Sequence, residues 1–160
     1  MNAFGLNIIL AVAWVGFTGS VSLTGLITGF VIGYGALWLI QPLIGTSSYF
    51  RRVTAWIKLI IMFHYELIVS SLEVAFDILT PRHRARPALI EVPLDVKTDT
   101  GILLVTNLIS LTPGTLSIDV SEDRKTLLVH AMFADDPDAL RKSLKDGMER
   151  WVIDAVEGSR

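Results

Sequence analysis

The sequence lacks cysteine altogether, and it lacks charged residues over its first fifty positions. The absence of cysteine excludes disulfides, thiol catalysis and cysteine-ligated metals. Of the 30 charged residues, 14 basic and 16 acidic, none lies in residues 1–50, six lie in 51–79 and 24 follow. A water-soluble domain does not leave fifty consecutive positions uncharged, so a wholly soluble chain is excluded. The formal net charge of −2 gives no support for a nucleic-acid partner, which would need a basic face.

Two apolar runs fill the uncharged half, over residues 3–17 and 23–40. An α-helix rises about 1.5 Å per residue, so each run is near the minimum length for a hydrocarbon core of about 30 Å. We therefore predict a two-helix transmembrane hairpin over residues 1–50. Ion and proton paths through lipid normally use ionisable side chains, so this hairpin is a poor candidate for a translocating element.

Three glycines of the second run, Gly25, Gly29 and Gly33, are spaced four residues apart. This spacing places them on one helix face, where small residues let the backbone of another helix approach closely. The helix that approaches is either the first run of the same chain or part of a partner subunit. We predict a packing or partner interface at these glycines.

Residues 51–80 are predicted to form an amphipathic helix, with the helical period running from 53 to 79. At 100° per residue its polar side chains fall within a sector about 120° wide. This stripe contains Lys58, Glu66, Ser70, Glu73 and Asp77. The helix either crosses the membrane with the stripe toward a partner, or lies in the membrane surface with the stripe toward water.

Basic residues on both sides of this helix favour the second placement. Arg51 and Arg52 precede it, and Arg82, Arg84 and Arg86 follow it. A spanning helix would put one of these clusters on the wrong side of the positive-inside rule, whereas an interfacial helix keeps both in the cytoplasm. We expect an interfacial helix, a multi-pass protein and cytoplasmic N- and C-termini.

Residues 81–160 are predicted to form a small cytoplasmic α+β domain of order β-α-β-β-α. Apolar and polar residues alternate over 90–97, and Pro93 in this strand indicates a sheet edge. A helix over 100–111 ends before Pro113-Gly114, and Asp136-Pro137 opens the last helix. A right-handed crossover gives strand order 1-3-2 with both helices on one face, a truncated ferredoxin-like layout.

The second and third strands are predicted to form a hairpin closed by residues 121–126. Pairing Glu122 with Lys125 sets a register in which Ile118 faces Val129 and Leu116 faces Ala131.

Catalytic and cofactor-binding motifs are absent from the sequence. In the predicted register, Ser117, His130 and Asp119 gather on the outer face of the sheet, but a flat sheet gives them neither a pocket nor a strained nucleophile turn. There is no glycine-rich phosphate loop and no pair of histidines at metal-ligand spacing. We predict no enzymatic activity, no cofactor and no metal.

A long motif in the charged half resembles a known family. Residues 107–121, centred on Leu111-Thr112-Pro113-Gly114-Thr115, and then residues 128–131, resemble the signature of the E subunit of Mrp-type (Mnh/Pha) multisubunit Na+/H+ antiporters. The resemblance covers essentially the whole chain. It implies an accessory subunit of a complex in the prokaryotic cell membrane that exchanges cytoplasmic sodium for external protons, with the ion paths assigned mainly to larger subunits.

Three functional hypotheses follow. The first is a structural and assembly subunit that has no ion-translocating site, binds the other subunits and the lipid bilayer, and docks through Gly25, Gly29 and Gly33. The second is a direct participant in ion transport, with Glu66, Glu73 and Asp77 lining an ion route. The third is a free-standing membrane-anchored regulator.

Overall fold

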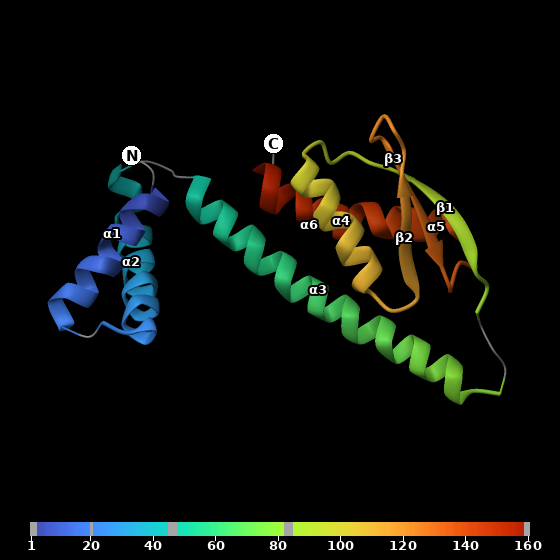
Figure 1. The fold of residues 1–160 in the computed structure, drawn as a ribbon, viewed down its shortest axis with the longest axis horizontal. Coiled ribbons are helices and arrows are strands. Elements are labelled where there is room, and N and C mark those ends of the chain that lie inside the picture. The colour runs from blue at the N-terminus through green and yellow to red at the C-terminus, as the bar shows by residue number, and fades with distance from the viewer. Residues whose placement is uncertain (1–2, 20, 45–47, 82–84, 159–160) are drawn as a thin grey trace. The chain divides into compact units, whose positions relative to one another are not determined.

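The computed structural model describes residues 3–19, 21–44, 48–81 and 85–158. Two compact units divide the chain, Met1–Val53 and Thr54–Arg160. The elements, in chain order, are α1 (Ala3–Thr18), α2 (Leu23–Ile44), α3 (Ser48–Leu79), β1 (Ala88–Pro93), α4 (Asp99–Leu111), β2 (Thr115–Val120), β3 (Thr126–Ala131) and a C-terminal helical segment (Figure 1). This last segment comprises α5 (Pro137–Leu144), α6 (Arg150–Val152) and two π-helical stretches, η1 (Lys145–Glu149) and η2 (Ile153–Gly158).

The first unit is a helical hairpin in which α1 packs against α2. The start of α3 also belongs to this unit, because α3 begins at Ser48 and not at residue 53 as expected. Tyr49 and Phe50 therefore lie in its first turn, where both side chains are buried together with Leu37. The apolar packing of this turn explains why the helix starts before the basic pair Arg51-Arg52.

The second unit contains a three-stranded antiparallel sheet of order β1-β3-β2, which confirms the predicted strand order. β1 is an edge strand, as Pro93 indicated, but it spans Ala88–Pro93 and does not continue to residue 97 as the alternation predicted. Asp136 caps α5, since its side chain accepts hydrogen bonds from the amides of Asp138 and Ala139. The predicted order of strands and helices in the charged half is therefore correct.

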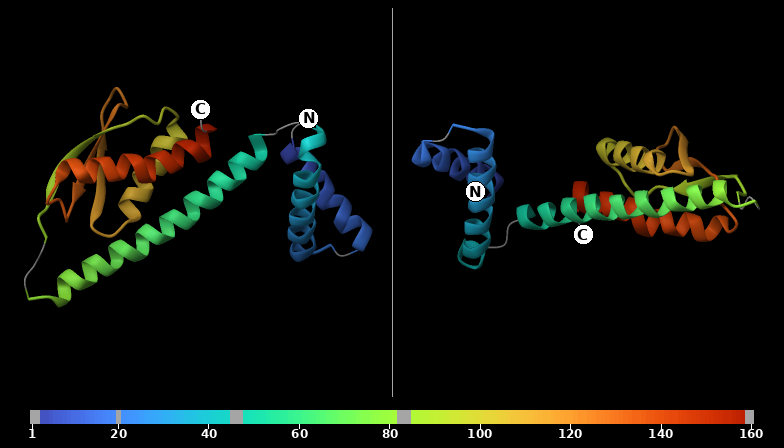
Figure 2. Two further views of the ribbon diagram at one scale, coloured as in Figure 1. Left: turned by 180° about the vertical axis from the view of Figure 1, so that it is seen from behind. Right: turned by 90° about the horizontal axis from the view of Figure 1, so that it is seen from below.

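One face of the sheet carries α4 and the C-terminal helical segment, as predicted. The core between these layers is apolar, and its members come from β1, β3, α4 and the C-terminal segment. The largest fully buried apolar side chains are Ile90, Val92, Val105, Ile109, Leu127, Val129 and Val152. α3 runs between α4 and the C-terminal segment in the right-hand view of Figure 2, and its Leu59 is buried in the same core.

The predicted hairpin register is correct near the turn and wrong beyond it. Val120 pairs with Leu127, but a β-bulge between Ser117 and Asp119 makes Ile118 an extra residue. Beyond the bulge Leu116 faces His130, and it is Thr115 that faces Ala131. A shift by one residue exchanges the two faces of a strand, so Leu116 and Ile118 are exposed.

Hydrogen bonds to α4 explain the position of the bulge. The Ser117 hydroxyl donates to the Thr106 carbonyl at 3.0 Å, and the Ser117 amide donates to the Ser110 hydroxyl at 3.1 Å. Ser117 therefore points toward the helix layer, and it does not share the outer face with His130 as expected.

The motif between α4 and β2 is a helix stop. The Thr112 hydroxyl donates to the Leu108 carbonyl at 2.9 Å, and the Thr115 hydroxyl donates to the Ile109 carbonyl at 2.6 Å. These bonds satisfy carbonyls that the end of a helix leaves without partners. Gly114 has φ +89°, a conformation that favours glycine.

Candidate functional site

The first predicted site, the glycine face of α2, contacts α1 of the same chain. A Cβ placed on Gly29 would lie 2.8 Å from the Trp14 Cβ and 2.9 Å from the Ala11 carbonyl oxygen. A Cβ on Gly33 would overlap Asn7 Oδ1 and lie 3.1 Å from the Leu10 Cβ. Only a glycine permits this approach, so two of the three predicted residues are used in packing within the chain.

The third glycine of the set, Gly25, lies near the start of α2. Its amide donates to the Ser22 hydroxyl at 3.0 Å, which helps to satisfy the exposed amides at the beginning of the helix.

A buried amide lies beside the glycine face. Asn7 is fully buried on α1, and its Nδ2 donates to the Tyr49 hydroxyl at 2.9 Å. Its Oδ1 has no hydrogen-bond partner among the described residues and faces the backbone of Gly33. The Asn7–Tyr49 bond links the start of α3 to the hairpin, within an aromatic cluster formed by Phe4, Phe30, Tyr34, Tyr49 and Phe50.

The second predicted site, the acidic stripe of α3, lies on the same helix face as Leu59. At 100° per residue, Leu59, Glu66, Glu73 and Asp77 fall within a sector about 40° wide. Leu59 is buried in the core of the sheet domain, so this face is directed toward the chain's own domain. Part of the acidic stripe therefore faces the sheet domain and not open water.

The opposite face of α3 is apolar and is not covered by the described residues of the second unit. Its exposed side chains include Ile57, Ile60, Ile61, Ile68, Leu72 and Phe76. By length and composition, α2 and α3 are the two described helices that could cross a membrane, and α1 is shorter. α3 thus has a packed face with the acidic residues and a free face of large apolar residues.

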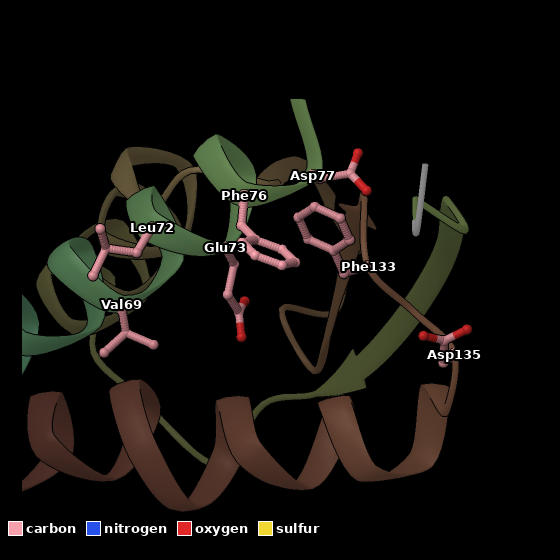
Figure 3. Close-up of a pocket in the computed structure, with 7 residues that line it drawn as sticks. All are labelled: Val69, Leu72, Glu73, Phe76, Asp77, Phe133 and Asp135. Carbon is pink, nitrogen blue, oxygen red and sulfur yellow. The ribbon is translucent and has the colours of Figure 1, made fainter. Parts of the chain in front are cut away.

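Two of the three acidic residues meet at a groove of about 490 Å³ between α3 and the loop after β3. Glu73 and Asp77 line it together with Asp135, and Val69, Leu72, Phe76 and Phe133 form its apolar part (Figure 3). Asp77 is only 2% exposed, whereas Glu73 is exposed and its carboxylate points into the groove. Glu66 is not among the groove residues described.

Asp135 is a groove residue that the sequence interpretation missed. It forms an ion pair with Arg86, whose Nε lies 3.2 Å from Asp135 Oδ1. Asn7 was also missed, although a lone amide in a run without charges is a signal for a buried polar contact. No signal along the chain could have found Asp135, because it is brought to the stripe only by the tertiary fold.

Glu157 and Lys145 of the sheet domain have shifted pKa values and take part in hydrogen bonds between distant segments. Burial alone would raise the pKa of Glu157, but hydrogen bonds from the amides of Thr98 and Lys97 hold it below its ordinary value. Burial alone would lower the pKa of Lys145, but hydrogen bonds to Asp95 and Glu149 raise it. Both groups fix the loop between β1 and α4 to the C-terminal helical segment.

The hairpin site offers close helix packing, and the groove at α3 offers an open acidic surface. Among the described residues, no group of three or more His, Asp or Glu side chains is arranged to hold a metal ion. The hairpin has close helix contacts and the buried amide of Asn7, and the groove has carboxylates beside aromatic rings.

A family described as Na+/H+ ion antiporter subunit matches residues 7–155 of the chain. The chain belongs to this family. It is 35% identical to the E subunit of a Na(+)/H(+) antiporter from Alkalihalophilus pseudofirmus, over 95% of this chain and 96% of the relative. It is 32% identical to the E1 subunit of a Na(+)/H(+) antiporter from Staphylococcus haemolyticus, again over 95% and 96% of the two chains.

A solved structure supports the same assignment. A chain in the structure of the Mrp complex from Dietzia sp. DQ12-45-1b matches with a TM-score of 0.50 and 27% identity, over 64% of this chain and 94% of that chain. The resemblance to Mrp-type E subunits is thereby confirmed. This antiporter subunit is a membrane protein of a transport family, with a helical N-terminal region and a small antiparallel sheet covered by helices.

Proposed function

We propose that this E subunit is an accessory, structural subunit of a multisubunit Na+/H+ antiporter and has no ion-translocating site of its own. Its partners are the other subunits of the complex and the lipid bilayer. The absence of Asp, Glu, Lys, Arg and His from residues 1–50 supports this role, because α1 and α2 then offer no carboxylate, amine or imidazole to exchange a proton or bind a cation.

The observation that carries the proposal is the division of α3 into two faces. One face packs on the sheet domain through Leu59, and the other exposes large apolar side chains. A helix that crossed the bilayer would carry the charged domain that packs at Leu59 into the hydrocarbon. α3 therefore lies in the cytoplasmic membrane surface, with its apolar face in lipid and the sheet domain beneath it.

The charges fit this orientation. Lys58, Glu66 and Glu73 leave no uncharged stretch longer than seven residues in the middle of α3, far below the roughly 20 residues of a spanning helix. Both chain ends are then cytoplasmic, only the turn between α1 and α2 is outside, and the arginines on both sides of α3 stay inside.

The test uses spin labels on single cysteines in the assembled complex, since the chain has no native cysteine. Labels at Ile57, Ile61, Ile68 and Leu72 all lie on the free face of α3. An interfacial helix gives all four about the same shallow depth, measured by collision with oxygen and with a water-soluble relaxant. A depth that is greatest at Ile61 and Ile68 and smaller at both ends would show a spanning helix and refute the placement.

In this proposal, the glycine face holds α1 and α2 together so that the hairpin inserts as one body. Because α1 fills the glycine face, anchoring of the subunit in the membrane does not require a partner subunit at Gly29 or Gly33. A partner subunit then contacts the outer surface of the hairpin, where Trp38 and Leu39 are exposed.

An alternative function is favoured by the groove at the end of α3. Glu73 faces an open, partly acidic space, as a residue on an ion route would. If the groove is on such a route, Glu73→Gln, and the triple change Glu66→Gln, Glu73→Gln, Asp77→Asn, should raise the sodium concentration at half-maximal antiport in vesicles. We expect the sodium concentration at half-maximal antiport to be unchanged by these variants in assembled complexes. Glu122→Gln on the exposed β2–β3 turn is the control.

The third hypothesis, a free-standing regulator, has a direct test. A tagged wild-type chain should co-purify with the other antiporter subunits after mild detergent extraction. A chain that purifies alone, while remaining folded in the membrane, would support the regulator and refute the accessory role.

A further inference from the structure

The outer face of the sheet, opposite α4 and the C-terminal segment, has His130 and Leu128 on its central strand and exposed apolar side chains on both edge strands. The cross-strand row Leu89, His130 and Leu116 lies on this face, and Leu128 and Ile118 lie beside it. Leu89 is 61% exposed, Leu116 is 52% exposed and Ile118 is 51% exposed. These side chains are neighbours, and they form a patch that a domain surrounded by water would not gain from exposing.

The β-bulge creates this patch. Without the extra residue, Leu116 and Ile118 would point into the core with Val120. The bulge keeps Val120 on the inner face and turns the other two outward, while the hydrogen bonds of Ser117 to Thr106 and Ser110 fix the change. The apolar outer surface is therefore held by specific bonds on the other side of the strand.

Strand addition at the sheet edges does not explain the patch, because both edges already have partners. On β1, the carbonyl of Glu91 accepts from Arg141 Nε at 2.8 Å, and the carbonyl of Pro93 accepts from Lys145 Nζ at 2.6 Å. On β2, besides the Ser117 bond, the amide of Val120 donates to Asp119 Oδ1 at 2.8 Å. These side-chain bonds engage part of each edge and so disfavour strand addition, which leaves the face as the surface for a partner.

The charges around the patch select the kind of partner. Glu91 and Asp119, the charged residues on the outward positions of the strands, are both acidic and exposed. An acidic border repels the anionic lipids of the cytoplasmic leaflet and repels a second copy of itself. It attracts a surface that is apolar at the centre and basic at the edge.

We propose that the outer sheet face of this subunit docks on a Lys/Arg-rich cytoplasmic loop of a neighbouring membrane-embedded subunit. Cytoplasmic loops of membrane proteins carry an excess of Lys and Arg, which matches the acidic border. Leu89, Leu116 and Ile118 supply the apolar contact, and Glu91 and Asp119 fix its orientation. This inference rests on the proposed accessory function and on a cytoplasmic sheet domain.

The test compares two pairs of apolar side chains in the complete complex. Leu89→Ser with Leu116→Ser removes the patch, and Leu103→Ser with Leu111→Ser removes two exposed side chains of α4, each 61% exposed, as the matched control. We expect the first pair to lower the amount of other subunits that co-purify with a tagged chain about tenfold or more, and the control pair to leave it unchanged.

A second variant keeps the apolar side chains and tests the charges. In the double variant Glu91→Lys, Asp119→Lys, co-purification should fall as the ionic strength is lowered, because like charges then repel more strongly. In the wild type, co-purification should fall as the ionic strength is raised, because the attraction is then screened. Hydrogen exchange of β3 amides in each variant separates lost docking from lost folding. Unchanged co-purification in both patch variants, with β3 still protected, overturns the inference.

Crosslinking identifies the occupant. A photoreactive group at residue 116 should label another subunit at a Lys/Arg-rich cytoplasmic loop. Labelling of lipid, or of a second copy of this chain, overturns the inference but leaves the accessory function intact. If the wild-type chain itself fails to co-purify with antiporter subunits, the proposed function fails first.

Discussion

Each of the two units of this chain is stabilised internally by a different kind of interaction. In the hairpin, α1 and α2 approach through glycines, and a buried side-chain hydrogen bond joins Asn7 of α1 to Tyr49. The sheet domain has an apolar core, and two carboxylates join its segments. Glu149 and Glu157 of the C-terminal segment accept hydrogen bonds from the amides of the loop between β1 and α4.

The solvent explains the difference. In lipid there is no hydrophobic driving force for two apolar helices to associate, so the hairpin depends on close van der Waals packing. Burial of apolar side chains out of water stabilises the sheet-domain core, and the backbone amides that donate to Glu149 and Glu157 compensate for the partial or complete burial of these carboxylates. The change from one kind of stabilising interaction to the other falls within α3, whose residues up to Val53 belong to the first unit and whose remaining residues belong to the second.

The largest effect is expected from the buried carboxylate of the sheet domain. Glu149 Oε1 accepts from the amide of Asp95 at 2.5 Å, and Oε2 pairs with Lys145 at 3.1 Å. Glu149→Leu leaves the buried amides of Asp95 and Val96 without their acceptor, while Lys145 keeps Asp95 and the Pro93 carbonyl, and it should lower the free energy of unfolding by about 3 to 5 kcal/mol. Native-state hydrogen exchange of β3 amides in the full chain measures the loss.

The control for this change is Asp95→Asn. Asp95 also pairs with Lys145, at 2.8 Å, but its side chain is largely exposed. A surface pair of this kind contributes up to about 1 kcal/mol. Equal losses in the two variants would show that burial of Glu149 is not the cause.

The next effect is expected in the hairpin. Gly29→Leu forces α1 away from α2 and should cost about 1 to 3 kcal/mol, because the Trp14 Cβ and the Ala11 backbone leave no room. Thermal unfolding of the subunit in nanodiscs measures it. Gly35→Leu, on the same helix with nothing within 4 Å of an added Cβ, is the matched control. A loss of the same size at residue 35 would contradict the close-packing account.

A smaller effect is expected from the buried bond of Asn7. Tyr49→Phe leaves the Asn7 amide without its acceptor and should cost about 0.6 to 1.7 kcal/mol, the range found for such bonds in membranes. The same nanodisc unfolding assay applies. Tyr34→Phe removes a neighbouring hydroxyl from the same aromatic cluster and should leave stability nearly unchanged.

The smallest effect concerns pH. The pKa of Glu157 is below its ordinary value of 4.5 in the folded chain, so the unfolded chain binds the proton more readily. Its contribution is present above pH 4.5 and disappears as the pH falls through the folded-state value. The difference in urea midpoint between wild type and Glu157→Gln should therefore be seen at pH 7 and should shrink as the pH is lowered below 4.5. A difference that persists in acid would exclude the carboxylate as its source.

Much of this fold was predictable from local patterns. The strand order and the cap at Asp136 follow from alternation, crossover handedness and turn chemistry. The bulge at Ile118 did not follow, because it depends on hydroxyl bonds from Ser117 to a helix that the strand pattern does not describe. The acidic stripe was visible along α3, but its orientation toward the sheet domain depends on burial of Leu59, which is a property of the tertiary fold.

The closed edges of the sheet also bear on how this subunit is made. A membrane subunit is synthesised before it meets its partners, and unassembled copies share the same bilayer surface. Open strand edges would let two waiting copies join by backbone hydrogen bonds and aggregate. Because Arg141, Lys145 and Ser110 already occupy edge positions, an orphan copy can persist with its apolar face uncovered and remain available for assembly.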